Sequence, residues 1–329
     1  MKSALLLITC LLATPSALAA SPSRKKAPPR PAPCQSQAPQ RTSWPQGTLL
    51  WGTARQSAKD EMSSVLASLD LSRVQLGDTP LKDVQLQDGR LVAPFLGAQG
   101  LAGARLQGAS SDGQPVEVAL CATESVAEDP ARLWYRIEIW NAKSASWENP
   151  CIATHRVPAP RALAVQGIWD GSGARSDLAG KFTFACENGA IAKCIGWGYK
   201  PWAHKDGRSV RELHQACTRM ARADYCGNGR SHTREDSPID MYDGLAMQAR
   251  TRETTSAWDP ARGSFEAAWT PEGAACLART RDGRALETIL AECPDRFEER
   301  AQDLGEGDRC TLMRKGARME EALLRNRSY

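Results

Sequence analysis

The side chains with the most chemical potential lie in one short stretch, His214 to Gly229. Placed on a helix, its first part carries His214 within or at the edge of an apolar stripe, and Asp224 lies there too if the helix lasts that long. A titratable group among apolar neighbours needs a partner, because an unpaired buried charge is costly. We therefore take His214, Asp224 and the adjacent Tyr225 as the candidate catalytic residues. The stripe consists of Val210, Leu213, Cys217, Met220 and Ala221.

His214 and Asp224 do not form a dyad on a straight helix, because ten residues separate them by roughly 15 Å. The favoured interpretation is a core histidine bonded to a backbone carbonyl and an aspartate that anchors the following turn. The alternative is a hydrolase in which either residue works with a partner from elsewhere in the fold. The chain has no G-x-S-x-G elbow and no H-E-x-x-H helix, which weakens the hydrolase hypothesis. Cys217 is disfavoured as a nucleophile, since a cysteine of an exported chain is expected to be oxidised.

Aromatic residues suggest a binding surface. Trp197, Tyr199 and Trp202 fall within six residues of one another. They predict either a platform for a sugar or a peptide, or rings that pack a β-rich core. With Arg222, they are the candidate binding residues.

A metal site is not predicted. Asp236, Asp240 and Asp243, with Ser237, offer oxygen ligands, but their spacing fits no EF-hand, and a solvated acidic turn is the favoured interpretation. No C-x-x-C pair occurs, so the cysteines do not suggest structural zinc. We expect no cofactor.

The first residues have the pattern of a signal peptide. Lys2 precedes an apolar run, Ala4 to Leu12, and small residues end at Ala17-Leu18-Ala19. The run is shorter than the ~20 residues that span a bilayer, and no later stretch is apolar enough to do so. We expect cleavage after Ala19, export to the periplasm or beyond, and no transmembrane segment afterwards.

Cysteine number agrees with export. Once Cys10 is removed with the signal peptide, an even number remains, which predicts a disulfide framework. The connectivity stays open, and the simplest pairings by sequence proximity are Cys121 with Cys151 and Cys186 with Cys194. The remaining cysteines are Cys34, Cys121, Cys151, Cys186, Cys194, Cys217, Cys226, Cys276, Cys293 and Cys310.

The rest of the chain divides by composition. Residues 20–46 are rich in Pro, Ser and basic residues and predict a disordered tether. Residues 47–160 alternate with period two around turn signals such as Asp88-Gly89, which predicts an antiparallel β-rich domain, with one helix near Ala58 to Leu69. Residues 161–329 predict a mixed domain stapled by most of the cysteines. The predicted fold class is therefore α+β.

Helices of the second domain are predicted from period and capping. Ser209 and Glu212 have the spacing of a capping box that opens a helix ending near Ala223. Two further helical periods include Leu286 to Cys293 and Met319 to Leu323.

Net charge argues against nucleic acid as a partner. The chain has 42 basic and 38 acidic residues, and its one basic cluster, Arg24 to Lys26 with Arg30, lies in the tether. A nucleic-acid binder would show a clustered basic face.

A set of short motifs resembles the bacterial ADYC domain family, which takes its name from a tetrapeptide present here as Ala223-Asp224-Tyr225-Cys226. The similarity covers roughly Gly167 to Ser328. One departure is Arg234 to Pro238, where the family leads us to expect a glycine-containing turn. The resemblance implies an exported or envelope-attached bacterial protein and transfers no catalytic residue. The motifs are Phe182 to Cys186, Lys193-Cys194, Gly198 to Trp202, His214, Cys217 to Arg219, Arg222 to Gly227, Ile239-Asp240 and Leu324 to Ser328.

Two functional hypotheses remain. The first is a non-enzymatic envelope or extracellular module that binds an unknown ligand or has a structural role. The second is a secreted hydrolase that uses His214 or Asp224. We favour the first, because no complete catalytic constellation occurs in the sequence.

Overall fold

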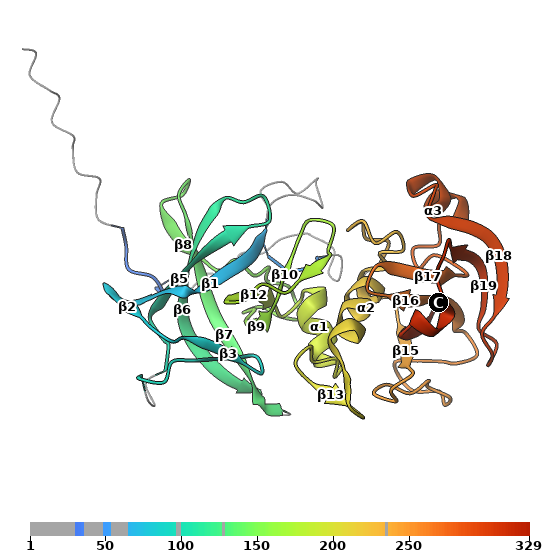
Figure 1. The fold of residues 1–329 in the computed structure, drawn as a ribbon, viewed down its shortest axis with the longest axis horizontal. Coiled ribbons are helices and arrows are strands. Elements are labelled where there is room, and N and C mark those ends of the chain that lie inside the picture. The colour runs from blue at the N-terminus through green and yellow to red at the C-terminus, as the bar shows by residue number, and fades with distance from the viewer. Residues whose placement is uncertain (1–29, 36–48, 54–64, 97–99, 127–128, 234–235) are drawn as a thin grey trace, which may run out of the picture. The chain divides into compact units, whose positions relative to one another are not determined.

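The structure is a computed structural model that describes residues 30–35, 49–53, 65–96, 100–126, 129–233 and 236–329 (Figure 1). Within it, Pro31–Tyr329 forms a compact unit. The predicted signal peptide and most of the predicted tether lie outside the described residues. No helix of the described ranges is long and apolar enough to cross a bilayer.

The first half of this unit is a six-stranded antiparallel barrel. Its strands follow the order β1, β5, β6, β7, β9, β12, and β12 pairs back onto β1 through Leu69 and Phe182. β2 also pairs with β1, and β8 pairs with β7, both antiparallel. The bounds are β1 Leu66–Leu76, β2 Thr79–Leu81, β5 Ala104–Ser110, β6 Pro115–Val126, β7 Asp129–Asn141, β8 Ser146–Glu148, β9 Ala162–Gln166 and β12 Lys181–Cys186.

Alternation along the strands explains the barrel core. In β7, Tyr135 and Ile137 point into the barrel cluster, whereas Trp134 belongs to the cluster around the helices. The predicted turn at Asp88-Gly89 is present between β3 (Gln85–Gln87) and β4 (Arg90–Val92), with φ values of 48° and 80°. The Leu91 amide of this hairpin donates to the Tyr135 hydroxyl over 2.8 Å, which fixes the hairpin to the barrel.

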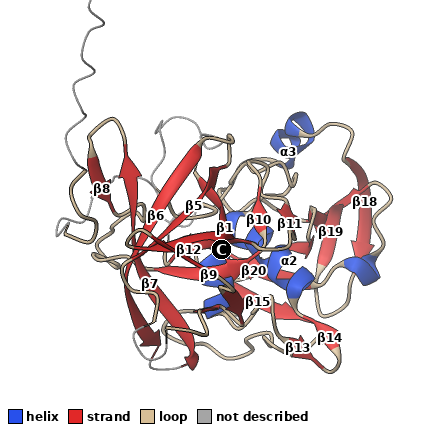
Figure 2. Cartoon of the chain, turned by 60° about the vertical axis from the view of Figure 1, so that its left-hand side comes forward, coloured by secondary structure: helices blue, strands red, loops and turns tan. Residues whose placement is uncertain are grey.

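Two helices connect the barrel to a second antiparallel sheet. α1 contacts β12 and α2, and α2 contacts β16, β17 and β20. The second sheet has the strand order β15, β20, β16, β17, β19, β18. Figure 2 labels β15, β20, β19 and β18 of this sheet, together with α2. The bounds are α1 Ala190–Gly196, α2 Arg211–Arg222, α3 Leu286–Glu292, β15 Ile239–Asp243, β16 Ser264–Thr270, β17 Gly273–Leu277, β18 Phe297–Asp303, β19 Arg309–Arg314 and β20 Leu324–Ser328; two short ladders join β10 Ile168–Trp169 to β11 Arg175–Ser176 and β13 His204–Lys205 to β14 Arg208–Ser209, and a 3-10 turn covers Met319–Glu321.

The α+β fold class and the two-domain description are not confirmed. Strand accounts for 41% of the structure and helix for only 11%, so the molecule is mostly β. The barrel also takes β9 and β12 from beyond residue 160, where we expected the first β region to end. The division at 160–161 stays a prediction.

Two local helix predictions need correction. Leu66 to Leu69 belong to β1 because they pair with β5 and β12, while residues 58–64 lie outside the described part. The capping box does not form: Ser209 ends the β13–β14 ladder, its Oγ accepts from the Arg211 amide over 3.3 Å, and Val210 is the N-cap. The end of α2 near Ala223 and the helix beginning at Leu286 are confirmed.

Ten cysteines form five disulfides, which confirms the disulfide framework. The two pairings by proximity were wrong, because barrel closure and helix packing bring residues together that are distant in sequence. Cα–Cα distances from 5.2 to 6.1 Å suit the bonds. The pairs are Cys34–Cys121, Cys151–Cys186, Cys194–Cys217, Cys226–Cys293 and Cys276–Cys310.

We predict that non-reducing proteolysis of the purified protein, read by mass spectrometry, yields these five cross-linked peptide pairs. The diagnostic pair is Cys34–Cys121, because its members lie 87 residues apart. A peptide that joins Cys121 to Cys151 would contradict the barrel arrangement.

Candidate functional site

The turn after α2 begins with a left-handed residue. Ala223 has φ 52° and ψ 42° and ends the helix, with its amide donating to the Met220 carbonyl and the Asp224 amide donating to the Arg219 carbonyl. A left-handed conformation costs an alanine roughly 1 kcal/mol. The contacts of the residues that follow must therefore hold this turn.

Asp224 anchors the turn through its carboxylate, which is wholly buried. It accepts hydrogen bonds from Arg219 Nη1 (2.6 Å) and from the amides of Asn228 (3.1 Å) and Gly229 (3.0 Å). Arg219 Nε also donates to the Pro271 carbonyl over 3.0 Å. The charge of Asp224 is thus neutralised and hydrogen-bonded within the protein, as the favoured interpretation predicted.

Tyr225 is equally internal. Its hydroxyl donates to Glu266 (3.1 Å) and accepts from the Arg281 amide (2.8 Å), and its ring stacks on Trp269 at 5.3 Å. Burial, with the charge of Glu266, raises the pKa of Tyr225 well above its ordinary value. A phenol held in this way is not available as an acid or a nucleophile near neutral pH.

A buried ion pair behind Tyr225 escaped the sequence analysis. Arg281 and Glu266 have fully buried side chains and form two parallel bonds, of 3.0 and 2.8 Å. Arg281 also donates to the carbonyls of Met220 (2.8 Å) and Ala221 (3.2 Å) in the last turn of α2. The sequence signal that could have revealed this pair is Glu266, the one charged residue among the apolar residues of β16.

Cys226 and Gly227 complete the turn. Cys226 bonds to Cys293 at the end of α3. Gly227 has φ 63°, and a Cβ there would lie 1.8 Å from the Glu272 carbonyl oxygen, so no other residue fits without moving the β16–β17 turn.

His214 is a core histidine. It is fully buried, its Nε2 lies 3.1 Å from the Ile191 carbonyl oxygen, and its ring meets Trp169 edge-on. Burial lowers its pKa to about 3, so the imidazole is neutral in the folded protein. His214 contacts Ile191 and Trp169, whereas Asp224 contacts Arg219 and Tyr225 contacts Glu266, so the structure does not bring the three catalytic candidates into one cleft.

The predicted binding residues divide into two groups. Tyr199 is buried and its hydroxyl donates to Asp243 over 3.0 Å, and Arg222 is buried with Nη2 bonded to the Gly229 carbonyl. Trp197 and Trp202 are half-buried. Only the two tryptophans therefore retain surface that a ligand can touch.

Trp202 lines an open cleft of about 230 Å³. The ring lies against the β3–β4 turn, where a Cβ on Gly89 would come within 2.8 Å of it. Lys200 and Asp129 form an ion pair of 2.5 Å at the same cleft. The lining side chains are Asp88 from the hairpin turn, Asp129 and Arg132 from β7, and Lys200, Trp202 and Ala203 from the segment after α1.

The aspartates considered as calcium ligands serve separate contacts. Asp236 pairs with Arg156, Asp240 accepts from the Thr251 amide, and Asp243 accepts from the amides of its own turn and from Tyr199. Asp240 is buried rather than solvated.

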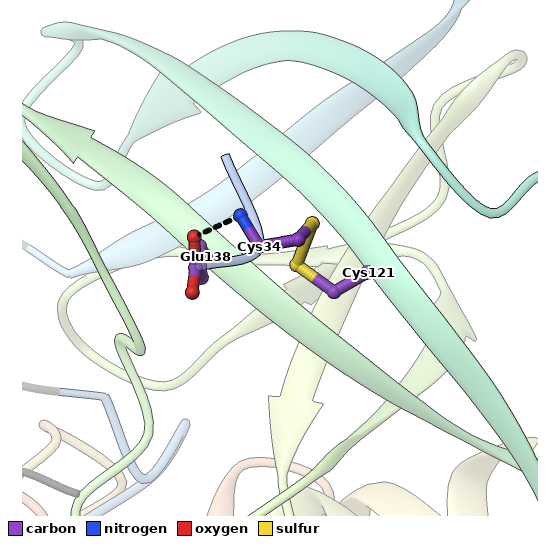
Figure 3. A group of neighbouring side chains, drawn as sticks. All are labelled: Cys34, Cys121 and Glu138. Carbon is purple, nitrogen blue, oxygen red and sulfur yellow. Dashed lines mark hydrogen bonds between the residues drawn. A yellow bond between two sulfur atoms is a disulfide. The ribbon is translucent and has the colours of Figure 1, made fainter. Parts of the chain in front are cut away.

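Among the described residues, one group has the proximity of metal ligands: Cys34, Cys121 and Glu138, whose donor atoms lie within 4.8 Å of one another (Figure 3). The two sulfurs are bonded to each other, so no thiolate is available in this state. Cys121 is the extra residue of a bulge in β6, and the Cys34 amide donates to Glu138 over 2.6 Å. The group attaches residues 31–35 to the barrel.

We predict that Asp224→Asn destabilises the folded state by about 3 kcal/mol, because it leaves the buried Arg219 without its counter-charge. Urea unfolding monitored by tryptophan fluorescence measures this loss. Asp236→Asn is the matched control, since Asp236 is exposed and its pairing with Arg156 should contribute little. Equal stability of the two variants would contradict the anchoring role of Asp224.

We also predict a pH dependence that His214→Gln reduces. The folded pKa of His214 lies near 3 and the unfolded value near 6.5, so below pH 6.5 the unfolded chain binds a proton that the folded chain does not. The free energy of unfolding should therefore decrease as the pH is lowered below 6.5, by up to about 1.4 kcal/mol per pH unit from this group. Unfolding free energies compared between about pH 4 and pH 7 should show a shallower slope in the variant; identical slopes would place the imidazole in contact with solvent.

Comparison with protein families finds one match, to the ADYC domain, over residues 98–283. The match begins before β5 and ends at the turn before α3, so it starts earlier and stops sooner than the motifs suggested. No curated protein and no solved structure matches the chain. The matched region spans more than half of the chain and contains the turn whose residues are described above, and the protein therefore belongs to the ADYC domain family.

Proposed function

We propose that the protein is an exported, non-enzymatic binding module whose ligand site is the cleft beside Trp202. Five disulfides fit an oxidising compartment. The predicted signal peptide, the predicted tether and the resemblance to bacterial envelope proteins support export and attachment near the cell envelope.

One observation carries the proposal. The candidate catalytic residues His214, Asp224 and Tyr225 all lie at 0% exposure. Trp202, from the same family motifs, lies at the surface of a cleft that also contains four charged side chains. The accessible side chains of these motifs therefore favour recognition of a ligand over proton transfer.

The cleft favours a neutral, hydroxyl-rich ligand with a flat face. Its two carboxylates, Asp88 and Asp129, are balanced by Arg132 and Lys200, so the lining does not select an ion of either sign. An indole ring offers an apolar face, and the charged groups offer hydrogen bonds to hydroxyls. A volume of about 230 Å³ lies below the ~300–1,000 Å³ of drug-sized sites. It suits one ring of a saccharide, and we propose a glycan as the ligand.

The hydrolase alternative finds less support. A general base must reach a substrate proton within about 3 Å. His214 has its Nε2 at the Ile191 carbonyl, and Asp224 already accepts bonds from Arg219 and two backbone amides. Either residue would need a large rearrangement of the core before it met a substrate.

We predict that Trp202→Ala abolishes saccharide binding while the protein stays folded. Saturation-transfer NMR with oligomers of N-acetylglucosamine and of glucose is the measurement, because it detects weak stacking on an aromatic ring. Trp202→Phe should retain part of the signal, since a smaller ring keeps an apolar face.

Trp140→Ala is the matched control, because Trp140 is also a half-buried tryptophan, but its ring meets that of Trp147 edge-on where β7 pairs with β8. Binding that survives in Trp202→Ala, or that disappears equally in the control, would overturn the assignment of the cleft.

A further inference from the structure

A second surface hollow differs from the charge-balanced Trp202 cleft because it has an excess of positive charge. It measures about 330 Å³, and its lining residues come from the segment after β15, the β18–β19 turn and β20. We call it the arginine hollow. Its lining residues are Arg250, Thr251, Arg252, Pro260, Glu306 and Arg327.

Two of the three guanidinium groups, those of Arg250 and Arg327, are held in place by neighbouring groups. Arg250 Nη1 donates to the Glu306 carbonyl over 2.7 Å, and its guanidinium lies 5.5 Å from the centre of the Tyr242 ring. Arg327 Nη2 donates to the Gly263 carbonyl and, over 3.4 Å, to the Pro260 carbonyl. A guanidinium carries five N–H donors, and these contacts engage one terminal nitrogen of each. The positioned groups therefore keep donors for a further acceptor.

The carboxylate of Glu306 lies between two of the arginines and supplies the negative charge that faces them. Its carboxylate lies 3.3 Å from both Arg250 Nη1 and Arg252 Nη2. These distances exceed the ~2.7–2.9 Å of strong charge-assisted bonds, and the side chains of Glu306 and Arg252 are 57% and 74% exposed. Glu306 also stands between Gly305 and Gly307, all three with positive φ, at the tip of a turn. Such a carboxylate is easily displaced.

The wider charge balance still leaves a positive hollow. Behind it, Asp308 is buried and accepts from the Tyr242 hydroxyl over 2.7 Å, and it pairs with Arg325 over 3.4 Å and with Arg250 over 3.5 Å. Asp240 is also buried and accepts from the Thr251 amide. At the surface itself, three arginines face one carboxylate.

We propose that the arginine hollow binds a phosphate group, and that Glu306 occupies its place until the phosphate arrives. Guanidinium groups match the oxygens of phosphate bidentately, and a doubly charged group outcompetes a single exposed carboxylate. The site is separate from the Trp202 cleft and does not depend on the proposed glycan binding. The phosphate comes either free in solution or as the headgroup of an anionic lipid.

The experiment titrates the full-length mature protein with inorganic phosphate, followed by NMR of the arginine side chains. Arg252→Gln should weaken the affinity about tenfold, the effect of losing one charged hydrogen-bonding group. Glu306→Gln should instead tighten it, because the internal competitor loses its charge. Arg309→Gln is the matched control: Arg309 is an exposed arginine of β19 paired with Asp303, and its loss should change little.

A second arm tests flotation with vesicles of phosphatidylcholine alone and with added phosphatidic acid. Binding to the anionic vesicles that requires Arg252, without measurable binding of inorganic phosphate, identifies a headgroup; binding of inorganic phosphate alone identifies the free ion. Circular dichroism verifies that each variant is folded. The proposal fails if neither probe binds, or if Arg309→Gln weakens binding as much as Arg252→Gln.

Discussion

A buried ion pair between Arg281 and Glu266 joins the carboxyl end of α2 to the second sheet. Removing two such charges from water costs several kcal/mol each, so the pair is tolerable only where every remaining donor finds a partner. Arg281 meets this condition at the Met220 and Ala221 carbonyls, where the helix dipole also favours a cation. These bonds have directions as well as strength, and they therefore hold α2 in one position against β16. The apolar residues of α2 pack in one hydrophobic cluster with residues of α1 and the second sheet, and this packing requires the helix to keep that position.

The tetrapeptide that names the family is understandable from this junction. Ala223 accepts a left-handed conformation so that the chain can leave the helix. Asp224 accepts hydrogen bonds from Arg219 and two backbone amides. Tyr225 forms hydrogen bonds to Glu266 and to the Arg281 amide, and Cys226 forms a disulfide with Cys293 at the end of α3. Each of the four residues has a distinct structural role, which its backbone conformation or its side-chain contacts define. The polar groups of the motif are thus engaged in contacts that hold α2, α3 and the second sheet together.

The groups that a ligand can reach lie elsewhere. The cleft beside Trp202 has balanced charges and an aromatic wall, whereas the arginine hollow has an excess of positive charge and a displaceable carboxylate. Both are shaped by loops and strand ends that the rigid core supports, which is the usual place for binding residues. Five disulfides add to that rigidity by restricting the unfolded chain.

The sequence alone was sufficient for features that depend on local chemistry. The Asp88-Gly89 hairpin and the end of α2 follow from neighbours in the chain, and both are confirmed. The disulfide framework followed from the even number of cysteines and the predicted export, and it is also confirmed. The internal roles of His214 and Asp224 also followed, because a titratable group among apolar residues must find a partner. The family resemblance came from short strings of the same kind.

Only the tertiary structure decided which distant groups meet. Barrel closure by β12 on β1, the partners of each cysteine, the strand at Leu66 to Leu69 and the pairing of Glu266 with Arg281 depend on contacts between residues far apart in sequence. The same holds for the gathering of Asp88, Asp129 and Trp202 around one cleft, and of Arg250 and Arg327 around another. Local periodicity carries no information about contacts between distant residues. The free energy that favours these contacts comes from burial and hydrogen bonding across the whole fold.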